Sequence, residues 1–173
     1  MMKRFGVFLV AAATYVAAPA HAAVTSLTAE SNAAYLADYA KQPGVIKKTS
    51  GLMYKILHNG FGKRPGLNDD CTVSYTGSLI NGTVFDGTEE GLPTRLKPKA
   101  VIPGWTEALM NMREGDQWHI VIPPNLAYGA RGAGDGAIPP NQTLVFDVTL
   151  IAVTPFKEPP KDQQPDTAGN GAE

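Results

Sequence analysis

Hydrophobic and polar residues alternate along several short segments of the chain, and this period of two predicts β-strands. In residues 72–76, Val73 and Tyr75 fall on one face, while the hydroxyl side chains fall on the other. Alternation, or a short apolar run next to turn residues, also occurs at residues 52–57, 83–85, 118–122 and 144–153. We therefore predict about five strands, with one further strand fragment around residues 94–96.

A second periodicity, that of a helix, follows the dipeptide Pro103-Gly104. Apolar residues recur there at i, i+3, i+4 and i+7, at Trp105, Ala108, Leu109 and Met112. Gly115 is placed to follow the end of this segment. The pattern predicts one short helix from Trp105 to Met112 with a single apolar face to bury.

Residues 23–50 are polar and rich in alanine, and they contain a weaker helical pattern. Its apolar positions are Tyr35, Leu36 and Tyr39. Thr28 or Ser31 is a candidate N-cap, and Pro43-Gly44 would end the helix. One short helix buries little surface alone, so we expect it to dock on the domain or to lead into it.

The predicted strands follow one another through turns that are too short for the crossover connections of a parallel sheet. We therefore expect an antiparallel sheet, and the helix at residues 105–112 needs a surface on which to bury its apolar face. Together these features predict an α+β fold in which about five strands hold one helix against their concave face, with a short N-terminal helix.

The first residues are typical of a secretory signal peptide. Lys3 and Arg4 precede an apolar run from Phe5 to Ala18, which is short for a helix that spans a bilayer. Ala20-His21-Ala22 supplies a cleavage site, so we expect the mature chain to begin at Ala23. Cleavage after Ala20 and an uncleaved N-terminal anchor are the alternatives. No later stretch is apolar enough to span a membrane, which indicates a periplasmic or secreted protein.

These patterns divide the chain into four parts. Residues 1–22 form the signal peptide, and residues 23–50 form a helical lead-in. Residues 51–154 contain the predicted strands and the central helix, so we expect them to form the main domain. Residues 155–173 consist mostly of Pro, Lys, Asp, Gln and Gly, and we expect this tail to be disordered.

Charge and cysteine content exclude some classes of function. The chain has 15 Lys and Arg against 16 Asp and Glu, whereas nucleic-acid binding requires a strongly basic surface. The single cysteine, Cys71, excludes an intramolecular disulfide. Because Cys71 shares a strand face with Val73 and Tyr75, we expect its thiol to be buried.

Motifs for hydrolytic, metal-dependent and nucleotide chemistry are missing. The sequence has no G-x-S-x-G and no H-E-x-x-H, and His58 and His119 are the only histidines after the leader. The glycine-rich residues 132–136 neither follow a predicted strand nor open a helix, which argues against a phosphate-binding loop. We expect no metal and no cofactor.

Aromatic residues next to Gly/Pro loops are the remaining feature, and they lie in motifs whose order is specific. Five segments occur in sequence, at residues 73–77, 82–86, 101–105, 127–129 and 138–146. In this order they resemble the FKBP family of peptidyl-prolyl cis-trans isomerases across residues 51–153. The preceding helix and the Pro103-Gly104-Trp105 segment are most similar to the bacterial macrophage-infectivity-potentiator branch.

This resemblance implies a bent antiparallel sheet wrapped over one short helix, with a hydrophobic pocket between them. Trp105 would form the pocket floor, and Asp86 would lie at the rim. The backbone N–H of Ile102 and the hydroxyl of Tyr128 would bind a peptide carbonyl. The walls would be formed by Tyr75, Phe85, Val101, Ile102, Tyr128, Ile138 and Phe146.

Two positions depart from the commonest pattern of the family. Thr94 stands where an aromatic residue often lines the pocket, and Ala137 stands where a larger aliphatic residue is common. Both would shrink one wall, so we expect weaker binding of bulky ligands, including macrolide immunosuppressants that inhibit the family. We expect Thr94, Val101, Ala137 and Ile138 to bind substrate. We expect seven other residues to act on substrate as the catalytic set: Tyr75, Phe85, Asp86, Ile102, Trp105, Tyr128 and Phe146.

The resemblance implies an isomerase that acts on X-Pro bonds in unfolded or folding exported proteins. A non-catalytic periplasmic chaperone, or a module that binds proline-containing peptides in the same pocket, is the alternative. Asp86 would either orient other pocket groups or contact substrate directly. A long helical dimerisation arm found in the branch is missing, which favours a monomer.

Overall fold

The computed structural model describes residues 26–158 and shows an α+β fold, which confirms the predicted class. Seven strands form one antiparallel sheet in the order β1-β2-β6-β7-β3-β4, and β5 pairs with β3. The strands are β1 (Val45–Lys47), β2 (Met53–His58), β3 (Asp70–Leu79), β4 (Val84–Gly87), β5 (Thr94–Leu96), β6 (Gln117–Ile122) and β7 (Leu144–Thr154).

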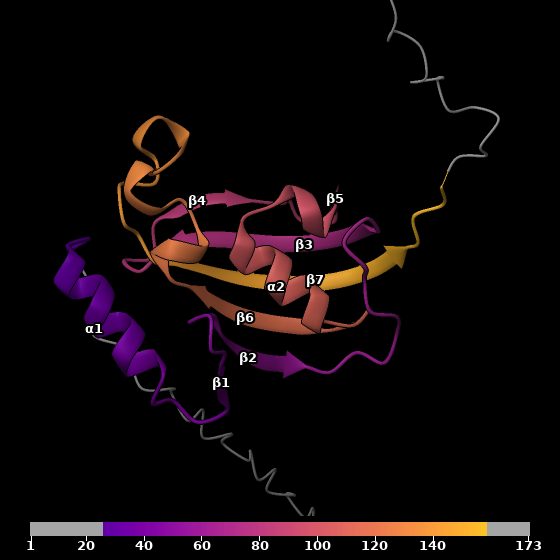
Figure 1. Cartoon of the computed structure of the whole chain (residues 1–173), viewed down its shortest axis with the longest axis horizontal. Coiled ribbons are helices and arrows are strands. Elements are labelled where there is room, and N and C mark those ends of the chain that lie inside the picture. The colour runs from indigo at the N-terminus through magenta and orange to yellow at the C-terminus, as the bar shows by residue number, and fades with distance from the viewer. Residues whose placement is uncertain (1–25, 159–173) are drawn as a thin grey trace, which may run out of the picture.

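The central helix α2 (Pro103–Asn111) lies across one face of this sheet (Figure 1). All four residues of its predicted apolar stripe are buried. A side chain at Gly104 would collide with Ile122 of β6, so glycine at this position permits the close approach of helix and strand. Pro103 occupies the first turn, where the missing N–H costs no helical hydrogen bond.

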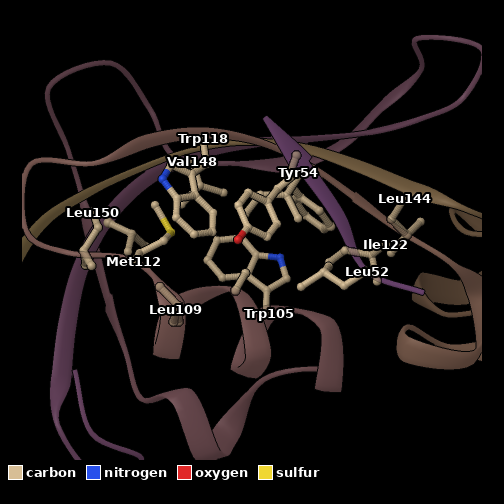
Figure 2. Packing of buried hydrophobic residues seen from close by; sticks show 14 of the residues in the cluster. Leu52, Tyr54, Trp105, Leu109, Met112, Trp118, Ile122, Leu144, Val148 and Leu150 are labelled. Atoms are coloured by element: carbon tan, nitrogen blue, oxygen red, sulfur yellow. The ribbon is translucent and has the colours of Figure 1, made fainter. Parts of the chain in front are cut away.

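Figure 2 shows the main core between α2 and the sheet. Trp105, Leu109 and Met112 come from the α2 segment, and they face buried side chains of the strands. Within the sheet, the rings of Tyr54 and Trp118 stack at a centroid distance of 4.1 Å with planes 8° apart. This core fixes the position of α2, and with it the position of Trp105.

The N-terminal helix α1 (Ala29–Tyr39) packs against the opposite face of the sheet. Because Val121 alternates with the core residues Ile120 and Ile122, its side chain points to that second face and is buried there. Thr28 is the N-cap, and its hydroxyl accepts a hydrogen bond from the Ser31 N–H at 3.2 Å. The lead-in therefore docks on the domain.

The prediction of about five strands missed β1, because residues 45–47 fall in the segment that we assigned to the helical lead-in. β1 has only three residues, too few for a period of two to stand out, and Ile46 and Lys47 are exposed. β1 begins directly after a turn at Gly44, which has a φ of 78°, and it pairs with β2. The fragment expected at residues 94–96 is β5.

One edge of β3 is shared by two short strands. β5 pairs with residues 71–73, and β4 pairs with residues 76–78. Between them, Thr88 takes the place of a strand residue, because its backbone N–H donates to the Tyr75 carbonyl at 2.9 Å. The Thr88 hydroxyl also accepts a hydrogen bond from the Tyr75 N–H at 3.0 Å. This edge is therefore split at Tyr75.

Other expectations concern single groups or the chain ends. Cys71 is buried, as its strand pattern predicted. The signal peptide at residues 1–22 and most of the tail at residues 155–173 lie outside the described residues. Between residues 26 and 158, no helix has the length and apolar character needed to cross a membrane. Within the same range, no three His, Cys, Asp or Glu side chains gather as a metal site.

Candidate functional site

A cavity of about 410 Å³ lies between the start of α2 and the strands β3, β4, β5 and β7. Its lining comes from segments far apart in the sequence: Tyr75, Phe85, Asp86, Leu96, Ala100, Val101, Ile102, Trp105, Tyr128 and Phe146. The structure thus brings together all seven residues expected to act on substrate, and Val101 with them. Three other expected residues lie outside the lining.

Four aromatic rings gather in the cavity lining, and three of their contacts are edge to face. The Trp105 ring lies 5.1 Å from the Tyr75 ring and 5.3 Å from the Phe146 ring, at angles of 78° and 84°. Phe85 meets Phe146 at 5.7 Å and 89°. Such contacts direct the positive edge of one ring at the negative face of another, which holds the rings in fixed orientations.

Gly77 makes this ring cluster possible, although the sequence reasoning did not single it out for the site. It lies opposite both Phe146 and Asp86 in the sheet. A Cβ at Gly77 would lie 2.6 Å from the Phe146 ring and 3.0 Å from the Phe85 ring. A glycine directly after the predicted strand residues Tyr75-Thr76, within the first of the five motifs, is the signal that could have identified it.

Asp86 is held by two hydrogen bonds at the rim. The Tyr75 hydroxyl donates to Oδ2 at 2.7 Å, and the Gly87 N–H donates to Oδ1 at 2.9 Å. Burial of Tyr75, and then its hydrogen bond to the Asp86 carboxylate, raise the pKa of the phenol well above 10.0. The proton therefore stays on Tyr75, and the pair forms a fixed hydrogen bond at neutral pH.

Two donors on the cavity wall have no partner among residues 26–158. The backbone N–H of Ile102, the residue that precedes α2, makes no hydrogen bond to any described group. The hydroxyl of Tyr128 likewise makes none, and this side chain is 41% exposed. Both donors can therefore reach an acceptor that enters the cavity from solvent.

Thr94, Ala137 and Ile138 were expected in the pocket, but they do not line the cavity. Thr94 begins β5 and is exposed, while Leu96, two residues further on the same face, reaches the cavity. Ala137 is exposed in a short turn of the long loop. Ile138 points into the core, and its backbone forms two 3.0 Å hydrogen bonds with Ala133.

Leu96 and Ala100 line the cavity and were not predicted to do so. The expected strand fragment included Leu96, but the loop around it gave no periodicity from which its side could be assigned. Ala100 ends a short 3-10 turn at residues 98–100 that leads into Val101 and Ile102. The small side chain of Ala100 and the aliphatic chain of Leu96 make this wall apolar.

Comparison with known proteins identifies a family for most of the described chain. Residues 62–151 match the family described as "FKBP-type peptidyl-prolyl cis-trans isomerase". Residues 9–56 match the "domain amino terminal to FKBP-type peptidyl-prolyl isomerase". The two matches together cover the lead-in and the main domain.

Curated relatives include proteins of the branch that the motifs indicated. The chain is 50% identical over 121 residues to "Outer membrane protein MIP" of Legionella longbeachae, covering 69% of this chain and 52% of the relative. It is 49% identical over 126 residues to "Peptidyl-prolyl cis-trans isomerase Mip" of Coxiella burnetii, covering 72% of this chain and 54% of the relative. The chain thus spans about half the length of these relatives.

Solved structures show the same fold. The crystal structure of FkpA from Escherichia coli superimposes with a TM-score of 0.69 at 42% identity, over 73% of this chain and 59% of that one. A peptidyl-prolyl cis-trans isomerase from Pseudomonas syringae gives 0.68 at 39% identity, over 73% of this chain and 92% of that one. On its sequence motifs, fold and cavity, the chain belongs to the FKBP-type peptidyl-prolyl cis-trans isomerase family.

Proposed function

We propose that the chain accelerates cis-trans isomerisation of X-Pro bonds, with the cavity around Trp105 as its active site. The observation that carries the proposal is the edge-to-face ring cluster next to two unpartnered donors, the Ile102 N–H and the Tyr128 hydroxyl. An apolar cup with hydrogen-bond donors at its wall suits a proline ring flanked by peptide carbonyls.

Isomerisation breaks no covalent bond, so the barrier of about 18–20 kcal/mol comes from the loss of amide resonance. The planar amide carries more charge separation than the twisted one, and water therefore stabilises the planar state more. Transfer of the bond into an apolar cavity removes this preference, which lowers the barrier. Each tenfold gain in rate requires only about 1.4 kcal/mol.

The two donors would serve to place the substrate rather than to transfer a proton. A hydrogen bond to the oxygen of the isomerising amide would itself favour the planar state. We therefore assign the Ile102 N–H and the Tyr128 hydroxyl to carbonyls that flank the proline, where they fix the peptide in the cavity. The rate gain then comes from the ring cluster around the twisting bond.

Asp86 would act through Tyr75. Its carboxylate accepts the Tyr75 hydroxyl at 2.7 Å, and this bond fixes the edge of the Tyr75 ring against Trp105. No proton transfer is required by the reaction, and the raised pKa of Tyr75 keeps its proton in place. We propose Asp86 as a residue that orients the cavity wall.

The substrates would be proline-containing segments of unfolded or folding proteins outside the cytoplasm. Two observations support the proposal that the chain is exported. The first is the leader at residues 1–22, with cleavage before Ala23, and the second is the name of the Legionella longbeachae relative, an outer membrane protein. Macrolide immunosuppressants are the corresponding proposed inhibitors of the cavity. We propose that the chain acts as a monomer.

A non-catalytic chaperone that binds the same segments is the competing function, and a protease-free isomerisation assay separates the two. We expect the mature chain to accelerate exchange of a proline tetrapeptide and a macrolide to compete for the site. Peptide binding without acceleration would establish the chaperone instead. Absence of both binding and acceleration would refute the assignment of the cavity.

A further inference from the structure

A buried hydrogen-bond network connects α1 to the end of the loop that carries Tyr128. Its members are Asn32 of α1, which is 3% exposed, and the consecutive residues Gln142 and Thr143, at 5% and 0%. Buried polar side chains are usually hydrogen-bonded, so the contacts of the Asn32 and Gln142 amides indicate what each amide holds. Thr143 joins the network through its backbone N–H, because its buried hydroxyl has no hydrogen-bond partner among the described residues.

Asn32 contacts both sides of the junction. Its Oδ1 accepts a hydrogen bond from the Thr143 backbone N–H at 2.7 Å. Its Nδ2 donates to Gln142 Oε1 at 3.1 Å and to the Thr28 carbonyl at 2.9 Å. Both amide protons and the oxygen of Asn32 are therefore used, two of the three bonds crossing from α1 to the loop end.

Gln142 extends the network in both directions. Its Nε2 donates to the Leu27 carbonyl, before α1, at 3.1 Å and to the Pro140 carbonyl at 3.0 Å. The two amides thus tie the chain just before and within α1 to the point where the long loop enters β7. Figure 1 shows α1 and this loop at the same end of the sheet.

The loop end is in turn bonded to the segment that carries Tyr128. Asn141, next to Gln142, has a φ of 58°, and its N–H donates to the Gly129 carbonyl at 2.7 Å. Gly129 follows Tyr128 directly. A shift of residues 141–143 would therefore be transmitted through one short backbone hydrogen bond to the exposed hydroxyl at the cavity wall.

From this geometry we infer that Asn32 is a positioning residue for the active-site loop, so that the lead-in helix is part of the isomerase unit. The inference rests on the proposed function, because Tyr128 is the group through which Asn32 acts. It assigns to residues 28–32 a role in catalysis that is separate from the packing of α1 on the second face of the sheet.

The test compares the full chain with Asn32→Ala in the protease-free isomerisation assay. We expect kcat/KM to fall about tenfold, since small misplacements of positioning groups are costly. Hydrogen exchange at backbone amides of residues 127–142 should accelerate, while exchange in β6 and at residues 148–153 of β7 stays as in the wild type. Val153→Ala is the matched control, because it removes buried volume from a core residue that does not line the cavity, and it should leave kcat/KM unchanged.

A double-mutant cycle with Tyr128→Phe separates positioning from a general loss of structure. If Asn32 acts through Tyr128, the double variant should lose about as much kcat/KM as the more impaired single variant. Losses that multiply, or an Asn32→Ala enzyme within about twofold of wild type, would overturn the inference. Gln142→Ala provides the same cycle from the other end of the network if Asn32→Ala does not fold.

An inactive wild type would refute the proposed function, whereas an active wild type with an unaffected Asn32→Ala would refute only the positioning role.

Discussion

The hydroxyl of Tyr75 donates a 2.7 Å hydrogen bond to Asp86, and the ring that carries this hydroxyl meets Trp105 edge to face. A charged rim residue and the buried floor of the cavity are thus linked through one tyrosine. Because the pKa of Tyr75 is raised, the hydroxyl remains a donor between about pH 6 and pH 9. Isomerase activity should therefore be independent of Tyr75 ionisation across this range.

The first prediction concerns the coupling of this pair. Tyr75→Phe and Asp86→Asn each weaken the same hydrogen bond, so each should lower kcat/KM by a few-fold, and the double variant should lose no more than the worse single variant. Steady-state assays on a proline tetrapeptide measure all three. An Asp86→Asn loss more than about tenfold beyond that of Tyr75→Phe would instead indicate direct contact of Asp86 with substrate.

The two tryptophans of the core allow a matched comparison of cavity and scaffold. Trp105 lines the cavity, whereas Trp118 is buried in the same core against Tyr54 and lies outside the lining. Trp105→Leu and Trp118→Leu should each cost about 2–4 kcal/mol of unfolding free energy. Only Trp105→Leu should lower kcat/KM at a temperature where both variants are folded.

Denaturant unfolding and activity are measured on the same samples for both tryptophan variants. Equal activity losses at equal stability losses would show that the core, rather than the cavity floor, determines the rate.

Gly77 gives a prediction about close packing. A methyl group there would lie 2.6 Å from the Phe146 ring, so Gly77→Ala must displace that ring or the strand that carries it. We expect a loss of about 1–3 kcal/mol in stability and a fall in kcat/KM. Gly66→Ala is the control, because its added methyl would meet Asp69 at an ordinary 3.4 Å. A Gly77→Ala enzyme with wild-type activity would remove the ring arrangement from the mechanism.

The raised pKa of the buried Cys71 thiol leads us to predict a loss of folding stability at alkaline pH. Burial, and then the carboxylates of Asp69 and Asp70, raise the pKa of its thiol from 9.0 to about 11. The folded chain therefore retains a proton that the unfolded chain releases. This contribution to stability is fully present below pH 9.0 and is lost as the pH rises toward 11.

Between pH 9 and pH 10, the unfolding free energy of the wild type should fall by on the order of 1 kcal/mol more than that of Cys71→Ala. Denaturant titrations under reducing conditions at each pH measure the difference in slope, which is independent of the small cavity left by the substitution. Parallel pH profiles for the two proteins would contradict the prediction.

Long periodic segments were predictable from the sequence. The apolar stripe at Trp105, Ala108, Leu109 and Met112 predicted α2, and all four side chains are buried. Alternation predicted β3, β6 and β7, since the pleat places every second residue on the same face. These elements form the core, so local pattern and tertiary packing agree there.

Very short strands, and faces of the sheet that a distant element covers, were harder to predict from the sequence. β1 has three residues and gave no period, and the burial of Val121 depends on α1, which ends at Tyr39, 82 residues earlier in the chain. The roles of Asn32 and Gln142 likewise arise from a contact between residues 110 positions apart. Sequence patterns describe which face a residue occupies, whereas these features depend on which element covers that face.

The residues that belong to the ordered motifs could be assigned to the site from the sequence. Residues in the connecting loops could not, because there the path of the backbone decides which side chain reaches the cavity. The seven expected acting residues meet in one cavity. Thr94 is replaced in the lining by Leu96, because the entry of β5 into the sheet places Thr94 at the exposed end. Ile138 is turned into the core by its two backbone bonds to Ala133.

The divided edge of β3 leaves the connection between β4 and β5 outside both ladders. Residues 89–93 pair with no strand, yet they join two strands that each carry a residue of the cavity lining, Asp86 in β4 and Leu96 in β5. Lengthening this connection would disturb neither ladder and would add new surface beside the mouth of the cavity. The fold thus offers a site where guest peptide can be grafted to alter substrate preference while the ring cluster stays intact.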